Sequence, residues 1–309
     1  VPLFKPWIEQ YAKGVPAEIG TLKHDSVADM LLTACDKYKN KPSFENFGKS
    51  ITYGELDQLS ADFAAFLQSK FKTGDSIALM MPNVLQYPIA VLGVLRAGMV
   101  VTNVNPLYTP RELKHQLNDS EAKAIVVIEN TASTLADVID ETGVETVITT
   151  SIGEMLGTIK GGLMNFVIKH VKKMIPAYQI ANTLTFKQAL NQGKILKHTD
   201  VERSLDDIAF LQYTGGTTGR PKGVLCNHRA RAITAHTVMV EEAIDERDRV
   251  GIVTPLFHVA ALNIMFQPAI LAGATTLFLT KWEPAAFVAM AKQHKMTANF
   301  MVPTQAAML

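Results

Sequence analysis

A segment rich in glycine and threonine, residues 213–223, carries the residue types in this chain that are best suited to chemistry. It reads Tyr-Thr-Gly-Gly-Thr-Thr-Gly-Arg-Pro-Lys-Gly. Its four glycines permit unusual backbone angles, so that successive N–H groups can converge on one anion. The threonine hydroxyls add donors, and a threonine oxygen can also ligate Mg²⁺. Because Arg220 and Lys222 add positive charge, the segment predicts a cradle for a polyphosphate.

Two familiar phosphate-binding patterns do not fit this segment. The nucleoside-triphosphatase loop places Gly-Lys directly before Ser or Thr, whereas Lys222 follows Pro221 and precedes Gly223. The dinucleotide fingerprint, Gly-x-Gly-x-x-Gly, is not matched either. An ordinary glycine-rich turn would leave the three threonines and two cations without a purpose. We therefore expect a phosphate loop of another kind.

Helical and strand patterns alternate along the chain that positions this loop. Capping boxes at residues 52–55 and 109–112 each predict a helix start. Apolar runs that predict buried strands occur at Ile77–Met81, Val100–Val104, Ala124–Ile128, Glu145–Thr149 and Ile208–Tyr213. This alternation predicts an α/β fold of parallel or mixed sheets flanked by helices. We expect a first α/β subdomain at residues 1–205 and a second, with the phosphate loop, at residues 206–309.

Composition excludes several classes of protein. The chain of 309 residues has a formal net charge of +1, which argues against a dedicated nucleic-acid binder. Cys35 and Cys226 are too few for a disulfide framework or a zinc ribbon, so we expect packing roles in a reducing compartment. The stretch between Arg249 and Lys281 lacks formal charge, but polar residues interrupt it. It predicts two strands flanking a helix near Ala260–Leu271 rather than a membrane span.

Residues 162–178 predict a basic amphipathic helix. The segment contains Lys169, His170, Lys172 and Lys173 and no acidic residue, and its other side is apolar. Such a helix can lie on an anionic membrane surface. The alternative is a surface helix whose apolar side packs on its own domain.

Residues 213–223 resemble the signature loop of the adenylate-forming enzymes, a superfamily that includes acyl-CoA synthetases, adenylation domains of peptide synthetases and luciferases. Residues 52–56, 255–258 and 302–304 are similar to further motifs of that superfamily. Met-Met-Pro-Asn at 80–83, Leu-Arg-Ala-Gly at 95–98 and the segment 105–113 resemble the bacterial long-chain fatty-acid:CoA ligases more closely.

The resemblance implies an acid–thiol ligase that forms AMP. ATP would activate a fatty acid to its acyl-adenylate, and CoA would then accept the acyl group. One alternative is an adenylation enzyme that passes another acyl group to a carrier protein, and another is a non-catalytic nucleotide-binding module. We expect a cytoplasmic setting, with fatty acid, ATP and CoA as partners, no nucleic acid, and a homodimer. Peripheral membrane contact through residues 162–178 is expected only if the basic segment lies on a membrane rather than on its own domain.

The resemblance also implies roles for particular residues. Thr217 would ligate Mg²⁺, and Thr217, Lys222 and His258 would be the catalytic residues. The residues implied to bind ATP are Tyr213, Thr214, Gly215, Gly216, Thr217, Thr218, Gly219 and Lys222. No covalent enzyme nucleophile is required. Because the superfamily's later motifs and its C-terminal lid domain lie beyond the matched part, we expect a truncated N-terminal domain that does not turn over alone.

Overall fold

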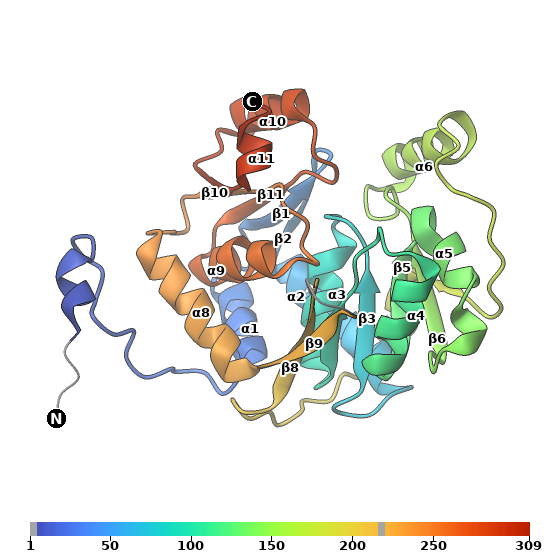
Figure 1. Ribbon diagram of the computed structural model, residues 1–309, viewed down its shortest axis with the longest axis horizontal. Helices are drawn as coiled ribbons and strands as arrows, with labels where there is room; N and C mark the ends of the chain where they lie inside the picture. The colour runs from blue at the N-terminus through green and yellow to red at the C-terminus, as the bar shows by residue number, and fades with distance from the viewer. Residues whose placement is uncertain (1–4, 216–219) are drawn as a thin grey trace.

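Two sheets and the helices that flank them form the fold in the computed structural model, which describes residues 5–215 and 220–309 (Figure 1). The larger sheet has seven strands, all parallel except for the antiparallel pair β8–β9. In spatial order they are β7 (Leu184–Thr185), β6 (Thr146–Thr150), β5 (Ala122–Ile128), β3 (Ser76–Met80), β4 (Val100–Asn103), β8 (Ile208–Thr214) and β9 (Lys222–Asn227).

The smaller sheet has five strands and is parallel except for the hairpin β1–β2. In spatial order they are β12 (Ala298–Phe300), β10 (Arg249–Ile252), β11 (Thr275–Phe278), β1 (Pro42–Asn46) and β2 (Lys49–Thr52). Each sheet therefore draws strands from both sides of residue 206. The two subdomains expected from the sequence stay a prediction about domain organisation.

Helices pack between and around the sheets. The longer ones are α1 (Val27–Lys37), α2 (Tyr53–Gln68), α3 (Gln86–Arg96), α4 (Pro110–Asp119), α6 (Thr158–Phe166), α7 (Phe186–Lys194), α8 (His228–Glu241) and α10 (Pro284–His294). The shorter ones are η1 (Pro6–Gln10), η2 (Glu129–Thr131), α5 (Ala132–Ala136), η3 (Ile139–Glu141), η4 (Val167–Val171), η5 (Ala261–Phe266), α9 (Gln267–Ala272) and α11 (Pro303–Ala306).

The main core lies where α2 and α3 join the two sheets. Helix α2 contacts β1 and β2 of the smaller sheet, while α3 packs on α2 and contacts β3 and β4 of the larger sheet. Phe44, Phe63 and Phe266 come from three different parts of the chain and are fully buried in this core. A second apolar cluster, which includes Leu113 and Leu117 of α4, covers the other face of the larger sheet. Burial on both faces explains why its parallel strands read as continuous apolar runs.

The structure confirms both expected capping boxes. The Thr52 hydroxyl accepts from the Glu55 N–H at 3.1 Å, and the Glu55 carboxylate accepts from the Thr52 N–H at 2.7 Å. Thr109 and Glu112 make the same reciprocal pair at the start of α4. The uncharged stretch is two strands, β10 and β11, on either side of η5 and α9, as the polar interruptions predicted.

The expected helix at 162–178 is wrong in its limits. Helix α6 already begins at Thr158, after Gly157 at a φ of +86°, and continues as the π-helical turn η4 only to Val171. Lys173 adopts a left-handed φ of +49°, and Pro176 can donate no backbone N–H to a helix. The apolar pattern of the sequence therefore continues past the point where the backbone leaves the helix. Within the described residues, no helix is long and apolar enough to cross a membrane.

Candidate active site at the carboxyl ends of β4 and β8

A pocket of about 550 Å³ opens at the carboxyl ends of β4 and β8 in the larger sheet. Three segments far apart in sequence line it: residues 103–108, the hairpin residues 212–215 and 224–226, and residues 257–259. In open sheets of parallel strands, ligands bind in the crevice outside the carboxyl ends of the strands, between the loops that follow them. The pocket brings Tyr213, Thr214 and Gly215 together with His258, four of the residues singled out from the sequence.

The hairpin β8–β9 sets the geometry of the glycine-rich segment. Tyr213 pairs with Gly223, and Thr214 pairs with Lys222 directly across the two strands. A Cβ atom on Gly223 would lie 3.0 Å from the Tyr213 ring, so glycine permits this close approach. The Tyr213 hydroxyl donates to the Asp119 carboxylate at 2.6 Å. Burial, then this carboxylate, raises the pKa of the Tyr213 phenol, which therefore stays protonated and anchored at neutral pH.

Four of the predicted ligands, Gly216, Thr217, Thr218 and Gly219, lie outside the described residues. Lys222 is exposed and opens β9 opposite Thr214, so that it stands at the base of the loop. Among the described residues, no cluster of three or more His, Cys, Asp or Glu side chains is arranged to hold a metal ion. An Mg²⁺ ion at this loop would be held by hydroxyl and phosphate oxygens, which suit its preference for hard ligands.

Helix α4 and several positively charged side chains lie beside Arg220 and Pro221 of the glycine-rich segment. His115 of α4 donates from Nε2 to the Pro221 carbonyl at 3.2 Å. Arg111, Lys114 and His115 line a second, more open hollow of about 960 Å³ together with Arg220 and Pro221. Glu112 and Asp119 also line it, so the charge there is mixed. The positive side chains favour a multiply charged anion on this side of the loop.

A chain of buried hydrogen bonds supports the floor of the pocket. The Tyr87 hydroxyl donates to Asn103 Oδ1 at 2.6 Å, and Asn103 Nδ2 donates to Gln212 Oε1 at 3.1 Å. Gln212 Nε2 then donates to the Phe257 carbonyl at 2.8 Å. Because Tyr87, Asn103 and Gln212 are all buried, this chain fixes the segment that carries His258 relative to the larger sheet.

The His258 ring is oriented by its own backbone neighbourhood. Its Nδ1 accepts from the Ala260 N–H at 3.3 Å, and the His258 N–H donates to the Pro255 carbonyl at 3.0 Å. With Nδ1 an acceptor, the neutral ring carries its proton on Nε2. His258 therefore offers an N–H donor to an oxyanion in the pocket that it lines.

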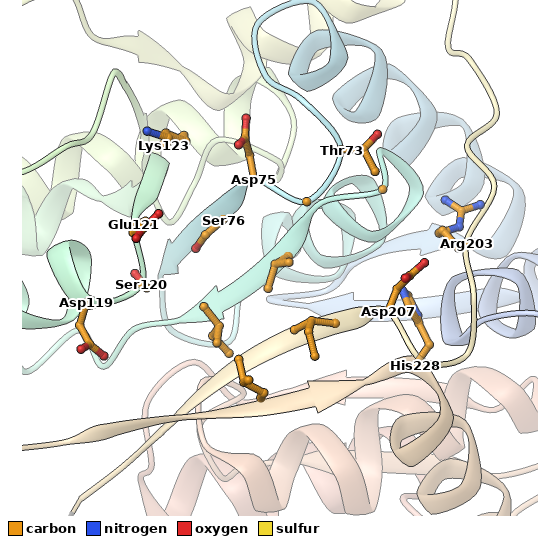
Figure 2. Close-up of a pocket in the computed structure, with 16 residues that line it drawn as sticks. Thr73, Asp75, Ser76, Asp119, Ser120, Glu121, Lys123, Arg203, Asp207 and His228 are labelled. Carbon is orange, nitrogen blue, oxygen red and sulfur yellow. The ribbon is translucent and has the colours of Figure 1, made fainter.

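Another hollow, of about 530 Å³, lies at the opposite, amino-terminal ends of β3 and β4 (Figure 2). Ser76, Lys123, Asp207 and His228 are among the side chains around it, and it contains no residue predicted for the site. Nδ1 of His228 accepts from the Val27 N–H at 3.2 Å, which is a structural role. The hollow at the carboxyl ends fits a nucleotide site better, because loops of several strands converge there.

Sequence reasoning missed Asn103 and Gln212. Asn103 is the last residue of β4, and Gln212 lies two residues before the end of β8. A polar residue near the carboxyl end of a largely apolar strand was the available signal. Cys226 lines the pocket, although it was expected only to pack. Cys35 is fully buried in the core, where burial raises the pKa of its thiol to about 12. The thiol of Cys35 is thus protonated and unreactive at neutral pH.

Comparisons with known proteins give the class to which this fold and site belong. The profile of the family described as "AMP-binding enzyme" matches residues 31–309. The chain therefore belongs to the AMP-binding enzyme family.

Among named relatives, the chain is 43% identical over 281 residues to a long-chain-fatty-acid–CoA ligase of Escherichia coli O157:H7, covering 89% of this chain and 50% of that protein. It is 31% identical over 309 residues to the ligase of the same name in Bacillus subtilis (strain 168), covering 97% of this chain and 54% of that protein. The chain thus spans about half the length of the curated relatives it matches.

Solved structures support the fold. A long-chain-fatty-acid-CoA ligase from Archaeoglobus fulgidus superposes with a TM-score of 0.78 at 22% identity, covering 97% of this chain and 56% of that one. ATP-bound MatB from Rhodopseudomonas palustris gives a TM-score of 0.73 at 23% identity, covering 91% of this chain and 50% of that one. The expected α/β architecture of an adenylate-forming enzyme is confirmed.

Proposed function

We propose that this chain carries the ATP- and acyl-binding part of a long-chain fatty-acid:CoA ligase that forms AMP. The proposal rests on one observation: the end of the β8–β9 hairpin and His258 line the same pocket. The 43% identity to a long-chain-fatty-acid–CoA ligase supports the substrate class. In the reaction, a carboxylate oxygen bonds to the α-phosphorus of ATP while the bond to pyrophosphate breaks, and the CoA thiol then displaces AMP.

The residues of the pocket would serve this reaction by positioning and by charge. Backbone N–H groups and hydroxyls of residues 214–219, with Lys222 at the base of the loop, would bind the β- and γ-phosphates. Mg²⁺, held through Thr217, would offset the charge of the triphosphate. His258 Nε2–H would donate to an oxyanion as the two anions approach, which is the difficult step. The network through Asn103 and Gln212 keeps this donor in place.

Calorimetric titration of the 309-residue chain with a non-hydrolysable ATP analogue and Mg²⁺ tests the phosphate site. We expect binding that Lys222→Ala weakens at least about tenfold, since one charge-assisted contact contributes roughly 1.5–3 kcal/mol. Replacement of Lys194, an exposed lysine on α7, by alanine should leave binding unchanged. Equal affinity for both variants and the unchanged chain would contradict the assignment of the loop.

Pyrophosphate exchange by the full-length protein, measured with fatty acids of increasing chain length, tests the reaction. Acyl transfer to CoA rather than to a phosphopantetheinylated carrier protein would distinguish the ligase from the carrier-loading alternative. Nucleotide binding without carboxylate-dependent exchange would favour the non-catalytic module. Because the chain spans about half of its relatives, we expect no thioester formation by the 309 residues alone, and acyl-CoA release would refute that expectation.

We also propose a peripheral membrane contact through residues 158–174, the α6 surface. Ile159, Leu163, Phe166 and Val171 are 88%, 65%, 57% and 66% exposed, which is unusual for large apolar side chains in one short segment. In Figure 1, α6 stands at the upper right of the molecule, above α5. No acidic residue occurs between Glu154 and Asp200.

Charge complementarity supports an anionic bilayer as the proposed occupant of the α6 surface. Lys169, His170, Lys172 and Lys173 are all exposed beside its apolar residues. Each lysine near an anionic surface contributes about 1 kcal/mol. A cytoplasmic location and a homodimer, also expected from the sequence, stay predictions.

Sedimentation with vesicles tests the α6 surface. We expect binding to vesicles containing phosphatidylglycerol, little binding to pure phosphatidylcholine, and loss of binding when Lys169, Lys172 and Lys173 are changed to Glu. The matched control changes Lys187, Lys194 and Lys197 to Glu, because these are exposed lysines outside the surface. Equal loss in both triple variants would show that net charge, rather than the α6 surface, drives binding.

A further inference from the structure

A buried arginine on α8 has no carboxylate partner within residues 5–215 and 220–309, the part of the chain that the structure describes. Arg231 is only 2% exposed, and its guanidinium carbon lies 4.8 Å from the centroid of the Phe210 ring. Its Nη1 donates to Asn263 Oδ1. Its Nε and Nη2 have no hydrogen-bond partner among the described residues. Buried arginines are otherwise paired with carboxylates or fully hydrogen-bonded.

The two unpartnered atoms form one side of the guanidinium. The N–H groups of Nε and Nη2 point the same way, and this edge matches the two oxygens of a carboxylate. Burial lowers the pKa of the Arg231 guanidinium, and the neighbouring Cys226 thiol acts in the opposite direction. Arginine nevertheless remains charged at neutral pH. Arg231 is therefore an oxyanion-binding group whose Nε and Nη2 have, among the residues that the structure describes, only the weakly accepting Cys226 thiol as a neighbour.

The position of Arg231 relates it to the pocket of the candidate active site. Phe210, over which the guanidinium stacks, pairs across the hairpin with Cys226, which lines that pocket. Gln212, two residues further along β8 and therefore on the same face, also lines the pocket. Asn263, the partner of Nη1, lies in η5 only five residues after His258. Cys226 thus lines the pocket and also interacts with the guanidinium of Arg231, which does not itself line the pocket.

We propose that Arg231 forms a carboxylate-binding subsite at the inner end of this pocket. The carboxylate reaches the Nε and Nη2 edge by displacing the Cys226 thiol from the guanidinium, and it converts an uncompensated buried charge into a bidentate ion pair. The subsite rests on the proposed function in one respect, since a carboxylic acid is the class of molecule that the pocket would activate. The carboxylate is either the reacting group of the acid or a second carboxylate at its distal end.

Titration of the 309-residue chain with octanoate, and separately with octanedioate, tests the subsite. We expect Arg231→Met to weaken carboxylate binding at least tenfold and to raise the melting temperature of the ligand-free chain, because the variant removes an unpaired buried charge. Equal affinity for the two acids assigns the subsite to the reacting carboxylate, and tighter binding of octanedioate assigns it to a distal one.

Three controls separate the explanations. Arg229→Met removes an exposed arginine of the same helix, paired with Asp206 at 3.0 Å, and should leave carboxylate affinity unchanged. Cys226→Leu should block access and weaken carboxylate binding without changing Arg231. Arg231→Met should bind the ATP analogue as tightly as the unchanged chain does. If the unchanged chain does not bind the ATP analogue at all, the proposed function is refuted rather than the subsite.

Three results would overturn the subsite. The first is carboxylate affinity in Arg231→Met within twofold of the unchanged chain. The second is no carboxylate binding by an unchanged chain that still binds the ATP analogue. The third is a lower melting temperature of ligand-free Arg231→Met, because that would show that the guanidinium holds α8 to η5 rather than awaiting a ligand.

Discussion

Asn83 joins the two sheets, and its replacement should cost a defined amount of stability. It follows β3 and is 2% exposed. Its Nδ2 donates toward the carbonyls of Ile252, Thr254 and Leu279 at 3.1–3.3 Å, and its Oδ1 accepts from the Leu256 N–H at 2.9 Å. The carboxamide thus ties β3 of the larger sheet to the ends of β10 and β11 in the smaller one.

The size of the effect follows from the number of hydrogen bonds that the side chain can make. The side-chain amide has two N–H donors, so it can donate two hydrogen bonds to the three carbonyls. With the bond that Oδ1 accepts, the side chain makes three hydrogen bonds in all. At a net contribution of roughly 1 kcal/mol each, Asn83→Leu should lower the free energy of unfolding by about 3 kcal/mol. Urea unfolding followed by circular dichroism measures this as a lower midpoint at an unchanged m-value.

A second substitution makes the test sharper. Asn83→Asp places carboxylate oxygens against three carbonyls, so at neutral pH it should cost more than Asn83→Leu. Below the pKa of the new carboxyl group, protonation restores one donor and part of the stability should return. Asn191→Asp, on the exposed side of α7, is the matched control and should change little. If Asn83→Leu lies within about 1 kcal/mol of the unchanged chain, the proposed joint between the sheets is wrong.

Two further predictions concern the pocket and the hollow at the opposite ends of the strands. Gln212→Leu removes the donor to the Phe257 carbonyl. It should therefore weaken the binding of a sulfamoyl acyl-adenylate analogue about tenfold, the equivalent of ~1.4 kcal/mol. If calorimetry gives an unchanged affinity, the network does not position His258. Burial lowers the pKa of His228 to about 4, so between about pH 4 and 6.5 the unfolded chain binds more protons and the free energy of unfolding rises with pH by at most ~1.4 kcal/mol per pH unit. His228→Gln should flatten this slope and leave the slope above pH 7 unchanged; urea midpoints that keep the slope below pH 6.5 would contradict this origin.

The parts of the fold that the sequence predicted rest on interactions between near neighbours. Thr52 with Glu55 and Thr109 with Glu112 are capping pairs three residues apart, so their geometry is encoded within one helical turn. The apolar runs of the strands predicted a buried parallel sheet because both of its faces are covered. At residues 158–174 the same reasoning misplaced the helix, since an apolar pattern does not show where a left-handed residue such as Lys173 interrupts the backbone.

By itself, the sequence determined the α/β class, because periodicity and short motifs reside in consecutive residues. It also predicted the phosphate loop at residues 213–223 and a role for His258 in the site. Only the tertiary structure decided which residues share the pocket. Asn103 lies 109 residues from Gln212, and Asn83 lies 173 residues from Leu256. The unpaired edge of Arg231 likewise emerges only when α8, β8 and η5 pack together. Such contacts depend on how whole elements are arranged, and no local pattern of residues records that arrangement.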